Sequence, residues 1–410
     1  MAEERSRGVT MRKTGSKLVI LFLCGFAMAA PSALGQPATP GDPVRTLVQR
    51  LDLEKYKATI KGLTRFGDRR QGTARNRAAL DWIEAQLKSY GCTNTARVTY
   101  DYGAEPEHRV APAAVNAADV PHFNVGGARA RGFSRPTGVN TDPSLQPDEK
   151  LRALDLPPAV PGKREDVYCT KVGATHPGEM YIVAAHMDGI GFGEAANDNG
   201  SGTALVMELA RIFSAPGVQT DRSIRFVLWN NEETGLNGAA AYVAQRAPLQ
   251  GVESPPGSGR YPEPKWLGMI QHDMMLFDHG MPRADGSLSP VQRPEADVNI
   301  EFQVQSKFAE QSKALAFLLE DANEKYATDY PAAIGSHMTN TDSHEFQDAV
   351  ASVSLRENER GAQVGNGWDP QWHQPTDLYA TYDDKDFRLG LNAAQTTLSA
   401  VARLAGATVK

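Results

Sequence analysis

The residues best suited to chemistry lie in a short, glycine-rich loop that follows an apolar run of the sequence. His186, Asp188 and Asp198 all fall within the segment AAHMDGIGFGEAANDNGSG. Imidazole nitrogens and carboxylate oxygens are among the ligands that zinc binds in proteins. The loop therefore predicts part of a metal site.

Further candidate ligands occur later in the chain. They are Glu232 and Glu233 in LWNNEETG, Asp273 in IQHDMM, and His373 in WHQPTD. A site for two zinc ions requires a carboxylate that bridges the ions, a histidine and a terminal carboxylate on each ion, and an uncommitted base beside the attacking water. These residues supply all of those groups, so we predict a site for two zinc ions. Cobalt and manganese stay open as alternatives because such sites select weakly among these metals.

The local sequence around Asp198 suits it to the bridging position. Gly200 and Gly202 allow the backbone to turn tightly behind it. Ser201 is expected to cap the helix that follows, since a serine hydroxyl can accept a hydrogen bond from a free backbone N–H of the first turn.

Asp188 and the two adjacent glutamates are expected to act in catalysis. Asp188 stands two residues after His186, where its carboxylate would fix the tautomer of the imidazole. One of Glu232 and Glu233 is expected to bind zinc. The other is free to take a proton from the attacking water and pass it to the leaving amine.

The candidate ligands are separated by segments with the patterns of buried strands and helices. Residues 180–186, 223–230 and 266–273 read as strands, and residues 349–355 are a further strand candidate. Residues 201–213, between the first two strands, read as a helix. Strands that alternate with helices predict an α/β fold with an open, largely parallel sheet, which binds ligands beyond the carboxyl ends of its strands.

Three groups of candidates stand at such strand ends. His186, the pair Glu232 and Glu233, and Asp273 each follow or close a predicted strand. A single histidine at a strand end, or a pair of glutamates, is more often an ordinary polar residue than a ligand. The agreement of three strand ends favours one common site over three unrelated ones.

The amino terminus has the pattern of a secretory signal peptide. Residues 18–30 (LVILFLCGFAMAA) carry no charge, and they follow Arg12, Lys13 and Lys17. This apolar stretch is shorter than the roughly 20 residues that span a bilayer. We therefore predict a signal peptide over residues 1–35 and an exported protein, periplasmic or secreted, without stable membrane insertion after cleavage.

Composition and charge exclude some classes of partner. The 410 residues carry a formal net charge of -6, and 41% of them are hydrophobic. An acidic balance gives no reason to expect nucleic acid or an anionic membrane surface as a partner. The oligomeric state is left open.

Two cysteines, Cys92 and Cys169, follow the predicted signal peptide. An oxidising compartment allows them to form a disulfide, and two separate buried thiols are the alternative. No CxxC spacing is present, so the sequence does not predict a cysteine zinc site.

Several motifs in the same order as in a known family add to this interpretation. The chain resembles the secreted two-zinc exopeptidases of metallopeptidase family 28, which include bacterial leucyl aminopeptidases and glutamate carboxypeptidases. HMD resembles the first ligand strand of that family, NDNGSG its bridging loop, NNEETGLNG its base and ligand pair, and FGDRRQGTARNRAALDWI its first helix.

The resemblance implies a role for each residue and a fold. One zinc would take His186, Asp198 and Asp273, and the other would take Asp198, Glu233 and His373. Glu232 would be the general base. The fold would be a mixed, largely parallel sheet of about eight strands flanked by helices.

Composition and periodicity predict three parts after the signal peptide. Residues 36–101 are expected to form an amino-terminal helical part, in which Leu80, Ile83 and Leu87 share a helix face and Gly91 ends the helix. Residues 102–164 lack an apolar period and are rich in Pro, Gly, Ala, Asp and Arg, which predicts a loop-rich insertion or lid. Residues 165–410 would form the zinc peptidase core.

The activity that the resemblance implies is hydrolysis of a peptide substrate, with aminopeptidase action as the leading form. A carboxypeptidase or dipeptidase on the same zinc pair is an alternative, with Arg356 or Arg360 as the group that binds a terminal carboxylate. A single-zinc glutaminyl cyclase and a noncatalytic, receptor-like binding domain are further alternatives.

The segment TNTDSHEF departs from the family pattern. Many relatives carry Ser-Asp-His followed by an aromatic residue, and the corresponding positions here are Thr341, Asp342, Ser343 and Phe346. No tyrosine stands just upstream to assist the oxyanion. His337 and His344 are the candidates to replace it.

Overall fold

A computed structural model describes residues 41–103, 139–277, 298–336, 340–357, 369 and 371–410. The predicted signal peptide therefore lies outside the described residues, as do His337 and Arg360. Among the described residues, none of the helices combines the length and the apolar character that a membrane span needs.

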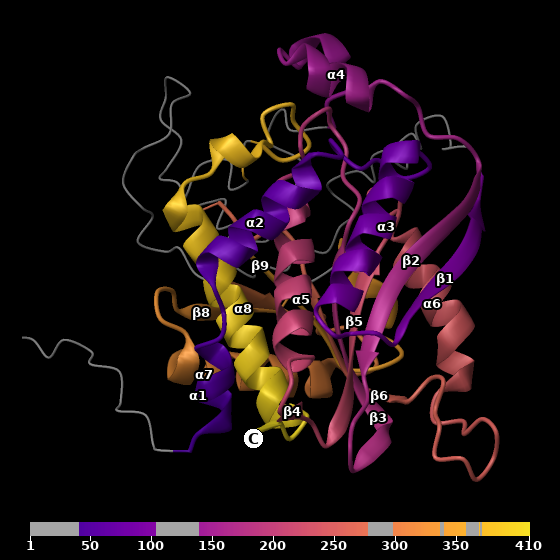
Figure 1. Cartoon of the computed structure of the whole chain (residues 1–410), viewed down its shortest axis with the longest axis vertical. Coiled ribbons are helices and arrows are strands. Elements are labelled where there is room, and N and C mark those ends of the chain that lie inside the picture. Colours follow the sequence, from indigo (N-terminus) through magenta and orange to yellow (C-terminus); the bar gives the residue numbers. More distant parts are fainter. Residues whose placement is uncertain (1–40, 104–138, 278–297, 337–339, 358–368, 370) are drawn as a thin grey trace, which may run out of the picture. The chain divides into compact units, whose positions relative to one another are not determined.

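The centre of the fold is a mixed sheet of eight strands in the order β1-β2-β5-β3-β6-β9-β7-β8 (Figure 1). Its strands are β1 (Thr95–Tyr102), β2 (Gly162–Lys171), β3 (His176–His186), β5 (Arg222–Trp229), β6 (Lys265–His272), β7 (Val298–Glu301), β8 (Ala332–Gly335) and β9 (Ser352–Glu357). The short strands β4 (Val218–Gln219) and β10 (Thr408–Val409) form a separate antiparallel pair. The predicted fold class is confirmed.

The middle of the sheet is parallel and its first edge is antiparallel. β3 runs parallel to both of its neighbours, β5 and β6, and β6 runs parallel to β9. β1, β2 and β5 are linked by antiparallel pairing. Because β5, β3 and β6 share one direction, their carboxyl ends meet at one edge of the sheet.

Helices cover both faces of the sheet. The helices are α1 (Pro43–Val48), α2 (Leu53–Thr64), α3 (Ala74–Ser89), α4 (Glu149–Asp155), α5 (Gly200–Phe213), α6 (Asn237–Arg246), α7 (Ala309–Tyr326) and α8 (Asp384–Leu404), with short 3-10 turns η1 (Pro143–Leu145), η2 (Ala247–Leu249), η3 (Asp342–Phe346) and η4 (Tyr379–Thr381). Figure 1 shows α2, α5 and α8 running across one face. The other face is covered by α6 and η3, whose apolar side chains form a second buried cluster with the sheet.

The alternation of side chains along β3 explains the two apolar layers. Val183 and Ala185 belong to the larger cluster, together with residues of α5 and α8. Ile182 and Ala184 point the other way and belong to the smaller, aromatic cluster. A strand buried on both faces must be apolar throughout, as the sequence of β3 is.

Element boundaries follow the sequence signals closely, with one exception. The end of α3 is confirmed, because the helix stops at Ser89 and Gly91 adopts a left-handed φ of 90°. The strand predicted over residues 349–355 was placed too early, since β9 begins at Ser352. Val350 still donates its N–H to the carbonyl of Phe346, which closes the turn that follows η3.

The segment predicted as an insertion joins two neighbouring strands. β1 ends at Tyr102 and β2 begins at Gly162, and these two residues are register partners in the antiparallel pair. Residues 139–161 contain η1 and α4, and residues 104–138 lie outside the described residues. The proposed division of the chain into parts stays a prediction.

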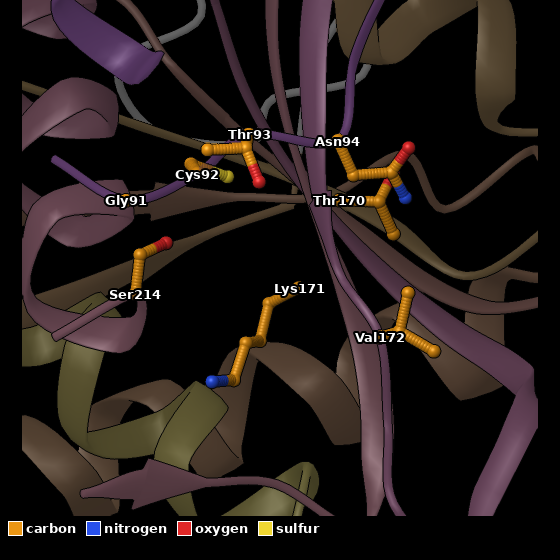
Figure 2. A pocket seen from close by; sticks show the side chains of 8 residues that line it. All are labelled: Gly91, Cys92, Thr93, Asn94, Thr170, Lys171, Val172 and Ser214. Carbon is orange, nitrogen blue, oxygen red and sulfur yellow. The ribbon is translucent and has the colours of Figure 1, made fainter. Parts of the chain in front are cut away.

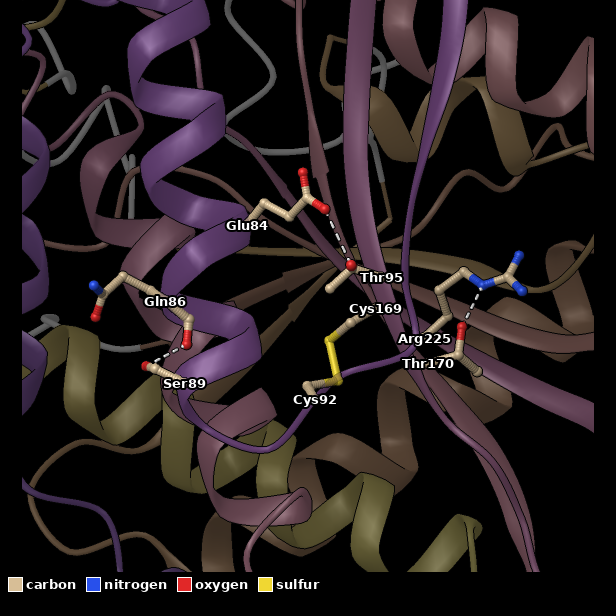
Figure 3. The surroundings of a disulfide bond; sticks show 8 residues. All are labelled: Glu84, Gln86, Ser89, Cys92, Thr95, Cys169, Thr170 and Arg225. Carbon is tan, nitrogen blue, oxygen red and sulfur yellow. Dashed lines mark hydrogen bonds between the residues drawn. A yellow bond between two sulfur atoms is a disulfide. The ribbon is translucent and has the colours of Figure 1, made fainter.

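Cys92 and Cys169 form a disulfide, which decides between the two alternatives left open above. Their Cα atoms lie 5.9 Å apart, and the bond joins the segment after α3 to strand β2 (Figure 3). A cavity of about 230 Å³, which Cys92 helps to line, lies beside it, and Figure 2 shows the lining side chains. Lys171 lines this cavity but donates its Nζ to the carbonyl of Val218, and none of the predicted metal ligands lies there.

We expect the disulfide to stabilise the fold. The bond closes a loop with a sequence separation of 77, and chain-entropy reasoning assigns such a loop about 4 kcal/mol of stability. The double variant Cys92→Ala/Cys169→Ala should therefore lose about 2 to 5 kcal/mol of unfolding free energy in denaturant titrations followed by circular dichroism. Untreated wild-type protein is the reference, and wild-type protein treated with a reductant is the control. Equal stability of all three samples would contradict the expectation.

Candidate metal centre

The carboxyl ends of β3, β5 and β6 bring the predicted ligands together. His186 is the last residue of β3, Glu232 and Glu233 follow β5, and Asp273 follows β6. The ring of His186 and the carboxylates of Asp198 and Glu233 place ligand atoms within 4.8 Å of one another, and a second group joins His186 to Glu232 and Asp273. The structure thus places these residues in one cluster.

Asp198 lies at the centre of this cluster. Its Oδ1 lies 3.4 Å from Nε2 of His186, and its Oδ2 lies 3.0 Å from Nε2 of His373. One carboxylate therefore faces two different histidines. A carboxylate that bridges two metal ions has this arrangement.

Each histidine has one further carboxylate beside it. Oδ1 of Asp273 lies 3.5 Å from Nε2 of His186, and Oε2 of Glu233 lies 2.8 Å from Nε2 of His373. The second oxygen of Glu233, Oε1, is buried and has no hydrogen-bond partner among the described residues. The two halves of the site are thus built alike, and a donor set of imidazoles and carboxylates with an unsatisfied oxygen suits zinc.

The buried carboxylates of the cluster strongly affect the pKa values of the two histidines. Burial alone would lower the pKa of His186, but the carboxylates of Glu232 and Asp198 raise it well above its ordinary value. Burial would likewise lower the pKa of His373, but Glu233 and Asp198 raise it to about 10. Such carboxylates need a cation beside them, and zinc ions can replace the protons in that role.

The two glutamates differ in what they face. Burial raises the pKa of Glu233 to about 7, against the opposing effect of His373. Burial raises the pKa of Glu232 well above its ordinary value, against the opposing effect of His186. Glu233 thus belongs to the His373 half of the site and Glu232 to the His186 half.

Asp188 acts differently from the expectation. Its backbone carbonyl, at 3.1 Å, is the hydrogen-bond partner of Nδ1 of His186, while its carboxylate oxygen Oδ1 lies 3.8 Å from that nitrogen. The same Oδ1 accepts the backbone N–H of Glu232 at 3.1 Å. The Asp188 side chain therefore holds the backbone of Glu232, and the Asp188 main chain orients the imidazole.

The helix that follows Asp198 also begins differently from the expectation. Asn199, not Ser201, is the N-cap of α5, and its side chain accepts the N–H of Gly202. Ser201 lies inside the first turn, where its hydroxyl donates to the carbonyl of Asn197. A serine at this position cannot reach the free N–H groups that a capping residue serves, because it is already helical.

Two residues that sequence reasoning missed hold the bridging loop in place. Asp377 accepts the backbone N–H groups of Asn197 and Asp198 at 2.8 and 3.0 Å. Arg69 is fully buried, and its guanidinium donates to the carbonyls of Met187 and Ala195. The motifs WHQPTD and FGDRRQG contained both residues, but nothing in their spacing showed that they serve main-chain groups.

The backbone beside the ligands is strained. Ala195, Asn231, Met274 and His373 all have φ values between 47° and 65°, a region that side chains other than glycine rarely adopt. Strain of this kind persists only where the surroundings hold it, and it concentrates at functional sites.

Arg356 is engaged by a predicted metal ligand, Asp273. It is 1% exposed, and its Nη2 donates to Oδ2 of Asp273 at 2.8 Å. Its guanidinium thus neutralises one oxygen of a predicted ligand while the other oxygen faces His186. The structure removes Arg356 as a candidate for binding a terminal carboxylate.

The segment that departed from the family pattern lies close to the glutamate pair. Asp342 is fully buried, and its Oδ2 accepts the side-chain N–H of Gln271 at 2.9 Å. Burial raises the pKa of Asp342 well above its ordinary value. Nδ1 of His344 is bonded to Nε2 of Gln347 at 3.0 Å, and the other candidate, His337, lies outside the described residues.

A family comparison agrees with this geometry. Residues 166–396, more than half of the chain, match the model of peptidase family M28. The chain belongs to peptidase family M28. The matched region contains all of the predicted ligands of this M28 chain. It also contains every strand from β3 to β9 in chain order.

The alignments with individual relatives cover only part of this M28 chain and a smaller part of each relative. A leupeptin-inactivating enzyme of Streptomyces exfoliatus is 26% identical over 55% of this chain and 38% of its own length. The aminopeptidase YwaD of Bacillus subtilis is 46% identical over 17% of this chain and 14% of its own length. The chain thus spans well under half the length of these relatives.

Solved structures share the M28 fold. A zinc aminopeptidase from Bacillus subtilis superposes with a TM-score of 0.53 at 16% identity, over 86% of this chain and 95% of that one. A glutaminyl cyclase of Porphyromonas gingivalis superposes with a TM-score of 0.51 at 15% identity, over 87% of this chain and 99% of that one. At these identities the likeness concerns the fold alone.

The shared position of Asp198 predicts different metal contents for two variants. Wild-type protein should hold about two zinc ions per chain, Glu233→Ala about one, and Asp198→Ala fewer than one, because Asp198 presents one carboxylate oxygen to each histidine. Elemental analysis after gel filtration measures this. Glu310→Ala, on the exposed start of α7, is the control, and equal losses in both ligand variants would contradict a bridging role.

Proposed function

We propose that this chain is an exported metallo-aminopeptidase, which uses two zinc ions to remove amino-terminal residues from peptides. The observation that carries the proposal is the position of Asp198, whose two carboxylate oxygens face His186 and His373 separately. A site for one ion needs no such carboxylate. The membership in family M28 supports peptide hydrolysis as the reaction.

The residues around Asp198 would hold the two ions. One ion would take His186, Asp198 and Asp273, and the other would take Asp198, Glu233 and His373. When bound, zinc supplies a Lewis acid that polarises the scissile carbonyl and lowers the pKa of water. All five ligand side chains are largely buried, so the protein itself limits access of bulk water to the centre.

Glu232 is the residue proposed to move the proton. Its carboxylate lies in the group with His186 and Asp273, and its backbone N–H is held by Asp188. From this position it would take a proton from the attacking water and donate it to the leaving amine nitrogen. Burial raises the pKa of Glu232, which makes its carboxylate a stronger acceptor for the proton of water.

The charge of the site supports aminopeptidase action over carboxypeptidase action. Three further carboxyl groups, those of Asp188, Glu232 and Asp342, lie beside the proposed ligands. A carboxyl oxygen accepts a hydrogen bond from a terminal ammonium, whereas a terminal carboxylate has no hydrogen to donate. Arg356 is buried against Asp273, so its guanidinium is not offered to the terminal carboxylate of a substrate.

The remaining alternatives are supported less well. The pairing of His373 with Glu233 at 2.8 Å supports a second metal position, which a single-zinc glutaminyl cyclase does not need. A receptor-like binding domain would not need the full set of ligands beside Glu232. The resemblance in fold to a cyclase therefore weighs less than the arrangement of the side chains.

Export and the choice of partner belong to the same proposal. The signal-peptide pattern of residues 1–35 supports export, and the disulfide between Cys92 and Cys169 suits an oxidising compartment. We infer a peptide substrate, no nucleic-acid partner and no stable membrane insertion after signal cleavage, in keeping with the acidic charge.

We expect Glu232→Gln to separate metal binding from turnover. The variant should keep its zinc, because Glu232 is not a proposed ligand, and kcat should fall by about 10² to 10⁴ because the proton carrier is lost. Zinc content and hydrolysis of a leucyl peptide are measured together, with Glu310→Gln as the control. Loss of zinc in Glu232→Gln and its retention in Glu233→Gln would mean that the two glutamates have exchanged roles.

A panel of blocked peptides should show which end of the substrate is recognised. Peptides with a free amino terminus should be cleaved whether or not the carboxyl end is amidated. Acetylation of the amino terminus should lower kcat/KM by about a hundredfold or more, because the ammonium that the acidic groups attract is gone. Cleavage of acetylated peptides only when their carboxyl end is free would establish a carboxypeptidase instead.

A further inference from the structure

The segment between β1 and β2 reaches the metal centre although it lies outside the part of the chain that matches the family. The connecting segment, residues 139–148, precedes the matched region, which begins at residue 166. Within residues 139–150, all of which the structure describes, Gln146 is the one buried residue. A single buried polar side chain in an otherwise exposed segment has to be explained by what it contacts.

Gln146 joins two loops that carry metal ligands. Its Nε2 donates to the carbonyl of Phe192 at 2.7 Å and to the carbonyl of Pro375 at 2.9 Å. Phe192 lies in the bridging-ligand loop, residues 187–199, and Pro375 lies in the His373 loop, residues 371–377. Both amide hydrogens of one side chain are thus used, one on each loop.

The Gln146 side chain is itself held from its own segment. Its Oε1 accepts the backbone N–H of Asp148 at 3.0 Å, and its backbone carbonyl accepts Nη1 of Arg152 at 2.6 Å. The hydrogen bonds fix both the rotamer and the main chain of Gln146. The side chain therefore acts as a rigid link, because it has little freedom to follow a movement of either loop.

Asn140 adds contacts of the same kind. Its backbone N–H donates to the carbonyl of His373 at 3.0 Å, and its Nδ2 donates to the carbonyl of Gly191 at 3.2 Å. The connecting segment therefore touches the main chain of a proposed ligand. His373 has a φ of 57°, so its strained backbone needs support from its surroundings.

The two ligand loops are packed main chain against main chain at this point. A Cβ atom added to Gly191 would lie 2.3 Å from the carbonyl oxygen of His373. Asp377 binds the loops together from within the matched region, through Asn197 and Asp198. Gln146 supplies a second link between the same two loops, through Phe192 and Pro375.

We propose that Gln146 is a positioning residue of the metal centre, which ties the His373 loop to the bridging-ligand loop and so keeps His373 opposite Asp198. This inference rests on the function proposed above. It assigns a part in metal binding to the connecting segment, which lies outside the region that matches the family. Substrate is not expected to contact Gln146, because its amide groups are fully engaged with main chain.

The test compares Gln146→Met with Gln250→Met. Methionine has a similar length and removes both donated hydrogen bonds. Gln250 is the matched control, since it too bonds main-chain groups, those of Ala247 and Trp266, but touches neither ligand loop. Zinc affinity is measured for both ions by competition with a chelator, and the absorption spectrum of the cobalt-substituted protein reports the ligand geometry.

The expected result is a selective effect on one ion. Gln146→Met should weaken the binding of one of the two ions by about tenfold, as is usual when an outer partner of a ligand is removed, and should change the cobalt spectrum. Excess zinc should restore turnover. Gln250→Met should match the wild type in all three respects. In the metal-free protein, hydrogen exchange should increase in residues 187–199 and 371–377 of Gln146→Met only.

Other outcomes decide against the inference in distinguishable ways. Wild-type protein that binds two zinc ions and cleaves peptides, together with a Gln146→Met variant whose two affinities stay within about twofold of it, would overturn the positioning role alone. Wild-type protein that binds no zinc would overturn the proposed function and this inference together. If Gln146→Met does not fold, Asn140→Ala, at a partly exposed position, should weaken the same ion, and an unchanged affinity would overturn the inference.

Discussion

The structure depends on the burial of several carboxylates around two imidazoles. Asp198, Asp273, Glu232 and Glu233 lie together in a part of the protein where water does not separate their charges. Buried carboxylates at such distances repel one another and favour neutral forms unless cations lie between them. The cluster is therefore unfavourable without a cation and suited to a metal centre, because divalent ions would compensate both the repulsion and the loss of hydration.

The parallel strands make this arrangement possible. β5, β3 and β6 end at the same edge of the sheet, so ligands that are far apart in the sequence need only short extensions to meet. Apolar layers on both faces hold the strands in register. The aromatic layer includes Trp229 and Phe346, whose ring centroids lie 5.6 Å apart, and Trp229 directly precedes the loop that carries the glutamates. The apolar core therefore fixes the positions of the strand ends that carry the site.

The loops beyond the strand ends depend on polar groups in place of apolar packing. Arg69, Asp377 and Gln146 all bind main-chain carbonyl or N–H groups of these loops from buried positions. Buried main-chain groups must be paired, and these side chains satisfy them while the backbone keeps conformations that it would not adopt alone. This explains why residues with positive φ, such as His373 and Asn231, persist at the edge of the sheet. Contacts from residues outside the ligand set stabilise these strained conformations.

The sequence by itself determined the fold class, most strand ends and the set of residues that meet at the centre, because apolar periodicity and the types of ligand are local properties. It also contained Asp188 and Ser201, but the parts they play were decided only in three dimensions: the Asp188 carboxylate serves Glu232, and Asn199 caps α5 instead of Ser201. The pairing of Cys92 with Cys169, the commitment of Arg356 to Asp273 and the link made by Gln146 were likewise settled by tertiary structure. Each of these depends on the approach of groups that are distant in the chain, and no periodicity or spacing records which side chain will face which main-chain group.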